Sequence, residues 1–168
     1  MPTITPEYGN FNNFNILFTA QYYKSTNQNL VSGANDITFD STQPWNDTGG
    51  YITHTNNTPN FTVVIPGLYQ LEWNVSVLGS GSSSTALLKQ ISIDITRSPL
   101  IEQVTIAQNA LISTGSNYGQ SLSATFYLEA GDVINCRVVN TFTGTATVLG
   151  KTGGSFDLNT WFTWRFIK

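Results

Sequence analysis

Hydrophobic and polar residues alternate along much of this chain with a period of two. The clearest run is LYQLEWNVSVL at 68–78, where apolar and polar side chains fall on opposite faces of an extended strand. Such alternation predicts a β-strand that is buried on one face only. The segment LLKQISIDIT at 87–96 repeats the scheme with isoleucines opposite polar residues. We therefore predict that these two strands share an outer sheet with one face in water.

Other segments carry apolar residues on both faces. The strands predicted at 14–24, 61–65 and 155–167 are of this kind, and the last contains three tryptophan and phenylalanine residues on one face with Trp161 and Ile167 on the other. We predict that they form a second sheet, covered by the core on one side and by other subunits on the other. The alternative is that both faces are buried within one thick domain.

Turn residues separate further short segments of period two, and apolar residues at helical spacing are nearly absent. Strands are also predicted at 36–40, 51–55, 121–130 and 133–140. Pro66-Gly67 joins two strands at a corner between the sheets, where glycine permits a positive φ, and the turn at Gly131-Asp132 lets 133–140 return beside 121–130. The pattern predicts an all-β, two-sheet antiparallel sandwich of about ten strands in one domain, 14–168, with 1–13 leading into it.

Composition supports one β-rich domain and narrows the possible partners. The chain has 168 residues, of which 40% are hydrophobic but only 10% are charged, enough apolar material for one sizeable core. The seven basic residues are scattered singly and the net charge is −3, so we expect no nucleic-acid partner.

No segment is apolar enough to enter a membrane, and the first ten residues, MPTITPEYGN, do not resemble a secretory signal. Cys136 is expected to be a buried strand residue.

Two motifs resemble a known family, the jelly-roll heads of complement q and the tumour necrosis factor (TNF) ligands. The first is F-x-x-x-x-P-G-x-Y before an alternating strand, and the second is L-x-A-G-D-x-I before the closing aromatic strand. They are matched here by Phe61, Pro66, Gly67 and Tyr69 and by Leu128, Gly131, Asp132 and Ile134. The resemblance covers about 14–168 and implies a TNF-like jelly roll that forms a homotrimer.

In that family the sheet with the first and last strands faces a three-fold axis. The resemblance implies axis-facing candidates at Tyr23, Val64, Tyr127 and Trp161. The surface, rich in Asn, Thr and Ser, is similar to that of viral, phage and bacterial spore-surface members. This chain contains no collagen-like Gly-X-Y stalk.

Catalytic chemistry is not indicated. A nucleophilic triad needs a histidine beside a nucleophile, whereas His54 is expected among surface turn residues. The ten acidic residues are dispersed, which argues against a glycosidase pair. We expect no cofactor; some complement q heads bind calcium, and Asn46 and Asp47 are weak candidates for such a site, although a polar turn explains them equally well.

These observations favour a non-enzymatic trimeric head for adhesion, receptor binding or structural decoration, exposed on the outer surface of a virion, phage or spore. The alternative is a soluble, cytokine-like ligand that clusters receptors, and a carbohydrate-active enzyme ranks third. A protein or glycan receptor would be bound by the loops at 41–50, 79–86, 113–120 and 141–154. Ligand-loop candidates are Trp45, Asn46, Asp47 and Tyr118.

Overall fold

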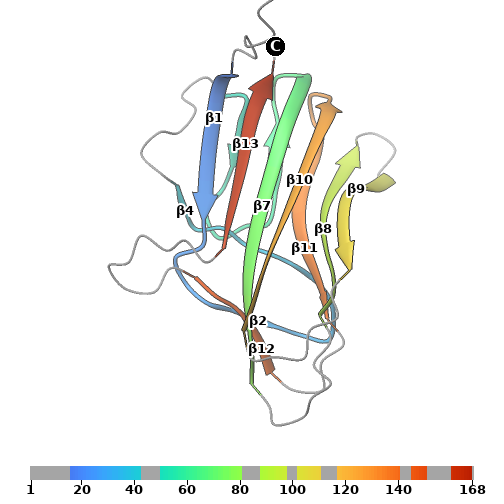
Figure 1. Ribbon diagram of the computed structural model, residues 1–168. Helices are drawn as coiled ribbons and strands as arrows, with labels where there is room; N and C mark the ends of the chain where they lie inside the picture. Colours follow the sequence, from blue (N-terminus) through green and yellow to red (C-terminus); the bar gives the residue numbers. More distant parts are fainter. Residues whose placement is uncertain are drawn as a thin grey trace, which may run out of the picture.

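The chain folds as a sandwich of β-strands, and Figure 1 shows β1 (Ile16–Tyr23), β13 (Trp161–Ile167), β7 (Gly67–Ser80) and β10 (Asn117–Leu128) side by side. This computed structural model describes residues 16–42, 50–80, 88–97, 102–110, 117–140, 145–150 and 160–167. Every element in those ranges is a strand, so the predicted all-β class is confirmed. In the same ranges, no helix has the length and apolar character required to span a bilayer. The predicted leading segment, 1–13, lies outside them.

Sheet A contains the first and last strands of the described chain. Its members are β1 (Ile16–Tyr23), β2 (Gln28–Leu30), β4 (Ser41–Thr42), β7 (Gly67–Ser80), β10 (Asn117–Leu128), β12 (Thr145–Val148) and β13 (Trp161–Ile167). They run in the order β2-β12-β7-β13-β1-β4, and β10 pairs with β7 on the side away from β13. All pairings are antiparallel, and β13 therefore lies between β1 and β7.

Sheet B covers the inner face of sheet A. Its members are β3 (Gly33–Asp36), β5 (Ile52–His54), β6 (Phe61–Val63), β8 (Leu88–Arg97), β9 (Glu102–Ala110) and β11 (Val133–Asn140). They run in the order β5-β6-β11-β8-β9, and β3 pairs with a further part of β11. These pairings are antiparallel as well, which confirms the predicted two-sheet antiparallel sandwich.

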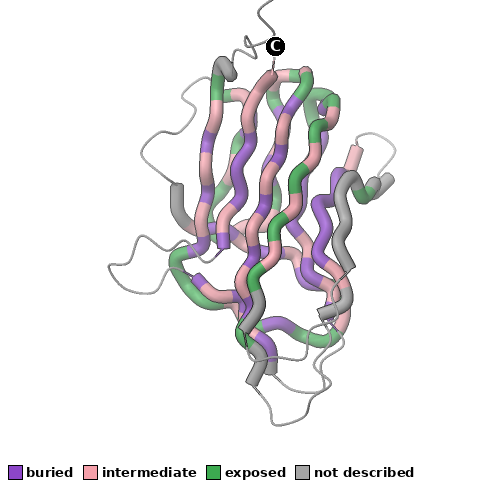
Figure 2. Tube along the Cα trace, viewed as in Figure 1, coloured by how far each residue is buried: buried purple, intermediate pink, exposed green. Residues whose placement is uncertain are grey.

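Alternation along the long strands decides which side chains enter the core. Figure 2 shows buried and more exposed positions following one another along β7 and its neighbours. On β7 the buried positions are Tyr69, Leu71, Trp73, Val75 and Val77, as the sequence predicted. The polar residues between them point to the outer side of sheet A, because successive side chains of a strand point in opposite directions.

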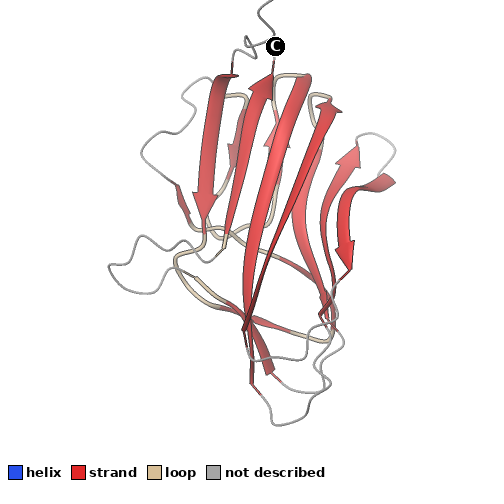
Figure 3. Cartoon of the chain, in the orientation of Figure 1, coloured by secondary structure: helices blue, strands red, loops and turns tan. Residues whose placement is uncertain are grey.

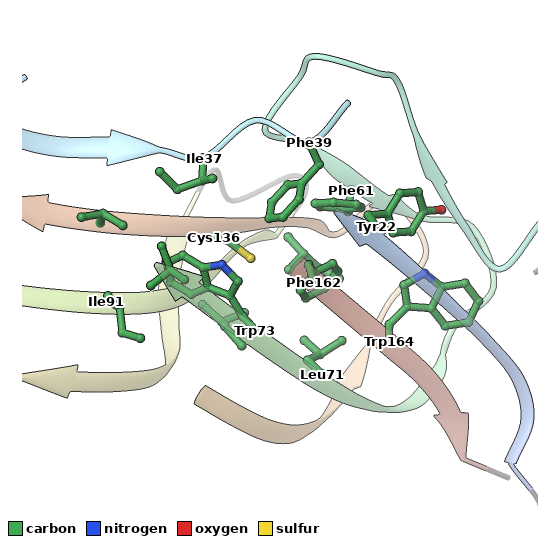
Figure 4. Close-up of a cluster of buried hydrophobic side chains, with 14 of the residues drawn as sticks. Tyr22, Ile37, Phe39, Phe61, Leu71, Trp73, Ile91, Cys136, Phe162 and Trp164 are labelled. Carbon is green, nitrogen blue, oxygen red and sulfur yellow. The ribbon is translucent and has the colours of Figure 1, made fainter. Parts of the chain in front are cut away.

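Large aromatic and aliphatic side chains from both sheets fill the space between them (Figure 4). Trp73 and Trp164 from sheet A are fully buried, together with Phe61 and Ile91 from sheet B. Burying each such side chain contributes about 1.5 to 3 kcal/mol relative to leaving it in water. Cys136 also lies in this core, as predicted, and burial raises the pKa of its thiol well above its ordinary value.

The predicted division of the strands between the two sheets is wrong. We predicted that 61–65 belongs with the first and last strands and that 68–78 belongs with 87–96. Instead, β7 pairs with β13 and β10 in sheet A, whereas β6 and β8 both pair with β11 in sheet B. Alternation reports which side of a strand is buried, but it does not report which strand lies alongside it.

Both turns that the sequence singled out carry the chain across the sandwich (Figure 3). Pro66-Gly67 connects β6 in sheet B to β7 in sheet A, as predicted. Gly131-Asp132 connects β10 in sheet A to β11 in sheet B, so the predicted return of 133–140 beside 121–130 is wrong. The Gly131 φ of 92° is a conformation that favours glycine.

Gly67 is needed for a different reason from the one predicted. The positive φ values of the described glycines are at Gly33, Gly50 and Gly131, and Gly67 is not among them. A methyl group at Gly67 would instead collide with the ring of Phe166, which packs over the backbone at this point. Next to it, the Tyr69 hydroxyl donates a hydrogen bond of 2.5 Å to the Ile65 carbonyl oxygen. These two contacts give the Pro-Gly-x-Tyr part of the motif its physical basis.

The outer side of sheet B is not the uniformly wet surface that the alternation predicted. Ser92 and Asp94 are buried, although they lie on the polar side of β8. The Arg137 guanidinium forms ion pairs of 3.2 Å with Asp94 and 2.7 Å with Asp36. Thr105 donates a further hydrogen bond of 2.8 Å to Asp94. Polar side chains on the outer side of sheet B thus bury one another through ion pairs and hydrogen bonds. The alternation of the sequence cannot predict such burial.

Short strands were the least predictable elements. The prediction placed a strand at 36–40, whereas β3 ends at Asp36, and β2 and β4 lie in segments that we did not expect to be extended. The predicted loop at 141–154 contains β12, which pairs with both β2 and β7. These strands of two to four residues are too short to show a period.

Candidate functional site

The outer side of sheet A presents a broad surface built from four long strands. We call it the A face and define it by the outward residues of β1, β13, β7 and β10. They are Thr19, Gln21, Tyr23, Leu68, Gln70, Glu72, Asn74, Ser121, Ser123, Thr125, Tyr127, Trp161, Thr163, Arg165 and Ile167. Their neighbours along each strand point the other way, towards the core. The regular register of the four strands arranges the A face in straight cross-strand rows.

Both ends of the A face carry apolar side chains, although Asn74 and Ser121 complete the row of Tyr23 and Trp161. At one end, Tyr23 of β1 lies directly opposite Trp161 of β13. At the other end, Leu68 lies between Ile167 and Tyr127. Leu68 is 38% exposed and Tyr127 is 56% exposed, which are large fractions for apolar side chains.

The middle of the A face is polar and carries one ion pair. The Arg165 guanidinium approaches the Glu72 carboxylate to 2.7 Å across the β13–β7 pairing. The Gln70 side chain donates a second, longer hydrogen bond of 3.3 Å to the same carboxylate oxygen. Glu72 and Arg165 are the only charged residues in the sequences of β1, β7, β10 and β13. The A face therefore has no net charge.

Three of the four predicted axis-facing residues share the A face. Tyr23 and Trp161 are cross-strand neighbours, and Tyr127 lies at the opposite end. Val64 does not belong with them: it follows the end of β6 in the corner towards β7, and its backbone N–H bonds to the Tyr51 carbonyl. The Val64 prediction assumed that 61–65 belongs to the sheet of the first and last strands, and because β6 belongs to sheet B, Val64 lies off the A face.

The predicted ligand loops are only partly described. Trp45, Asn46 and Asp47 lie outside the described residues, so the predictions for ligand and calcium binding stay untested. Tyr118 is not in a loop, because β10 begins at Asn117 and the backbone of Tyr118 pairs with Val77 of β7. The predicted loop at 113–120 is therefore shorter than expected. Among the described residues, no group of three or more His, Cys, Asp and Glu side chains is arranged to hold a metal ion.

His54 is the one histidine of the chain, and it packs inside the structure more than predicted. Its ring stacks on Phe61 with a centroid distance of 4.2 Å and meets the edge of Tyr22. Nδ1 lies 2.9 Å from the Asn60 carbonyl oxygen and Nε2 lies 3.0 Å from that of Phe39. Because both ring nitrogens face backbone acceptors, His54 is not placed to activate a nucleophile.

An open polar depression lies beside this ring, at the outer edge of sheet B. Its lining consists of Thr53, His54, Thr55, Thr58, Asn60 and Thr62. Two of its polar groups are already engaged within the fold: Thr58 donates to the Thr55 carbonyl, and the Asn60 side-chain oxygen accepts from Asn135. This depression therefore offers few free groups for recognition, and the A face is the stronger candidate.

Polar contacts at the β1–β2 connection hold the edge of sheet A in place. Burial lowers the pKa of Lys24, whose ammonium donates to the backbone and hydroxyl oxygens of Thr38. Burial raises the pKa of Asp40, but hydrogen bonds from Ser25 and Thr26 and the charge of Lys24 outweigh it and keep that pKa below its ordinary value. Both groups serve the fold through contacts within the chain.

Comparison with solved structures places this architecture in a known fold. Eiger TNF from S. frugiperda is similar to this chain with a TM-score of 0.57 and 18% sequence identity, over 90% of this chain and 92% of that one. Murine APRIL is similar with a TM-score of 0.58 and 10% identity, over 89% of this chain and 98% of that one. The chain therefore has the TNF-like jelly-roll fold. No protein family and no curated protein matches the sequence.

Proposed function

We propose that this chain is a non-enzymatic head domain that assembles into a homotrimer through the A face and binds other molecules. The observation that carries the proposal is the exposed apolar material at one end of the A face, Tyr127 and Leu68, together with half-buried Tyr23 and Trp161 at the other end. Exposed apolar side chains on a sheet face with no net charge favour burial against another protein surface. The same face belongs to the sheet that the resemblance predicts to surround a three-fold axis.

A binding role suits the fold better than catalysis does. Both nitrogens of the single histidine face backbone carbonyls, those of Asn60 and Phe39, so the ring is not placed to activate a neighbouring hydroxyl. Receptor contacts would then fall to the loops at the ends of the sandwich, as loops on a rigid scaffold carry recognition in many proteins. The virion, phage or spore setting rests only on the abundance of Asn, Thr and Ser in the sequence.

A soluble, receptor-clustering ligand is the second candidate. It is favoured by the fold shared with an insect TNF and with murine APRIL across nearly the whole chain. Both candidates need the same trimeric body, and they differ in whether the head is attached to a particle.

Light scattering coupled to size-exclusion chromatography tests the assembly. We expect the wild-type chain to elute as a trimer at micromolar concentration and Tyr127→Lys to elute as a monomer, because the substitution places a charge on the A face. Val31→Lys is the matched control, since Val31 is 68% exposed and lies after β2, off the A face. A monodisperse wild-type monomer would contradict the proposal.

A glycan array run beside a hydrolysis screen separates binding from catalysis. Stable retention of a glycan without turnover supports a binding head, and turnover of any substrate without stable binding would reverse the ranking. A protein receptor is sought with the intact trimer immobilised, because multivalent contacts raise the apparent affinity.

A further inference from the structure

We propose that the Glu72–Arg165 ion pair selects the register in which copies of this chain dock through the A face. The inference rests on the proposed homotrimer and assigns the pair a role in specificity. It starts from the position of the pair, which lies in the polar middle of the A face with apolar residues beyond it on both sides.

The pair is already largely enclosed in one protomer. Its 2.7 Å contact joins side chains that are 29% exposed for Arg165 and 26% for Glu72, even though both point to the outer side of the sheet. A second copy laid on the A face would remove much of the remaining water from both charges. A desolvated charge is tolerated only when a partner neutralises it, and here each charge brings its own partner from the same protomer.

The absence of a net charge on the A face also favours a second copy of this chain as the molecule that docks there. A strongly charged partner such as a nucleic acid or an acidic peptide would find no unpaired charge in the four strands that build the face. An uncharged, partly apolar surface is complementary, and the A face of another copy is such a surface. The pair lets the face be buried without excess charge.

The two apolar ends make the docking register matter. Along β13, Arg165 lies two residues from Ile167, and along β7 Glu72 lies four residues from Leu68, all on the same side. A copy displaced by one cross-strand row would press its charges against these apolar side chains instead of the polar middle. In the displaced arrangement, the charged side chains of Glu72 and Arg165 face apolar instead of polar neighbours. The loss of these polar contacts disfavours the displaced arrangement relative to the correct register.

Substitutions that break the pair test this role. Glu72→Gln and Arg165→Gln each leave one charge without its partner in the interface. We expect each to raise the dissociation constant of the trimer about thirtyfold or more, since removing one member of a buried charge pair is costly. Both variants should keep the wild-type circular dichroism and, as monomers, unfold near the wild-type midpoint, because a pair that still contacts water contributes little to the stability of a protomer.

The double variant Glu72→Met with Arg165→Met separates register selection from simple loss of affinity. Replacing a buried pair by apolar side chains is often neutral for affinity. We expect it to associate within about tenfold of the wild-type affinity, but as a mixture of stoichiometries in analytical ultracentrifugation. A double variant as weak as the single ones, or one that gives a single trimeric species, would overturn the proposed role.

Asp36→Asn is the matched control. It removes a carboxylate from an ion pair of the same length, 2.7 Å to Arg137, on the outer side of sheet B. Its association should equal that of the wild type. If the wild type assembles and the single variants assemble equally well, the pair has no such role while the homotrimer stands. If the wild type is a monomer, both proposals fail together.

Discussion

At the scale of single residues, Gly67 and His54 both depend on partners that the fold brings to them. The Pro-Gly pair predicts a corner in which glycine tolerates a positive φ. The structure instead requires glycine because the Phe166 ring occupies the space where a Cβ would stand. Phe166 comes from the far end of the chain, so no local pattern could reveal this contact. His54 illustrates the same limit, since its partners at Phe39 and Asn60 are brought to it by the fold.

Gly67→Ala tests the close approach of the Phe166 ring. We expect it to lower the free energy of unfolding by about 1 to 3 kcal/mol, because the ring must leave its position to admit a methyl group. Gly119→Ala is the control: its Cβ would meet only the Ser76 hydroxyl at 3.7 Å, an ordinary contact. Urea unfolding monitored by tryptophan fluorescence gives both values. Equal stability of the two variants would show that the ring yields without strain.

At the scale of elements, period-two alternation predicted the buried side of the long strands but not their neighbours. Leu71, Trp73, Ile91 and Ile93 are buried as expected. The strands that carry them nevertheless belong to different sheets, because pairing in a jelly roll joins segments that are far apart in the sequence. The choice of candidate residues was limited by the same error: Tyr23, Tyr127 and Trp161 lie on the A face, but Val64 does not.

The crossing at Gly131-Asp132 depends on one buried carboxylate. Asp132 accepts two hydrogen bonds from the Arg97 guanidinium, at 3.2 and 2.9 Å, and one from the Glu129 backbone N–H. This links β8 of sheet B to the turn through which β10 enters β11. The Asp in the Leu-x-Ala-Gly-Asp motif is therefore a structural residue.

Asp132→Asn should destabilise the fold by about 1.5 to 3 kcal/mol, the usual contribution of a hydrogen bond to a charged group. Glu129→Gln offers a comparison at the same arginine, because its carboxylate lies 3.5 Å from Arg97 but is 56% exposed. That variant should change stability by less than about 1 kcal/mol. Thermal unfolding of both variants measures the two effects. If Asp132→Asn leaves the stability unchanged, the charge of the Asp132 carboxylate does not stabilise this turn.

At the scale of the whole molecule, the sandwich leaves its two outer sides unequal. The outer side of sheet B has its charges joined in contacts such as Asp36–Arg137–Asp94. The A face combines apolar residues at its ends, exposed at Leu68 and Tyr127, with a centre of no net charge. From the aromatic residues of both parities in β1 and β13, the sequence predicts that one sheet needs an outside partner, and that stays a prediction. The sequence could not show the polar centre, because Glu72 and Arg165 lie on strands that the sequence analysis assigned to different sheets.

Stability should depend on protein concentration if the A face is buried by other copies. Association adds stability to the folded state by mass action, so the unfolding midpoint should rise by about 5 °C when the protein concentration increases a hundredfold. Tyr127→Lys should unfold at one temperature throughout the same range. Differential scanning calorimetry measures both proteins. A wild-type midpoint that does not move with concentration would be inconsistent with assembly.

The position of β13 between β1 and β7 has a consequence for synthesis. Ala20 is paired with Trp164, and Trp164 is paired in turn with Leu71, so sheet A joins the beginning, the middle and the end of the described chain. Until β13 leaves the ribosome, β1 and β7 lack the strand that connects them and the apolar faces of both remain open. Closing such distant contacts makes folding slow and leaves intermediates prone to aggregation. Sheet A can therefore be completed only once β13 has been synthesised and has paired with both strands.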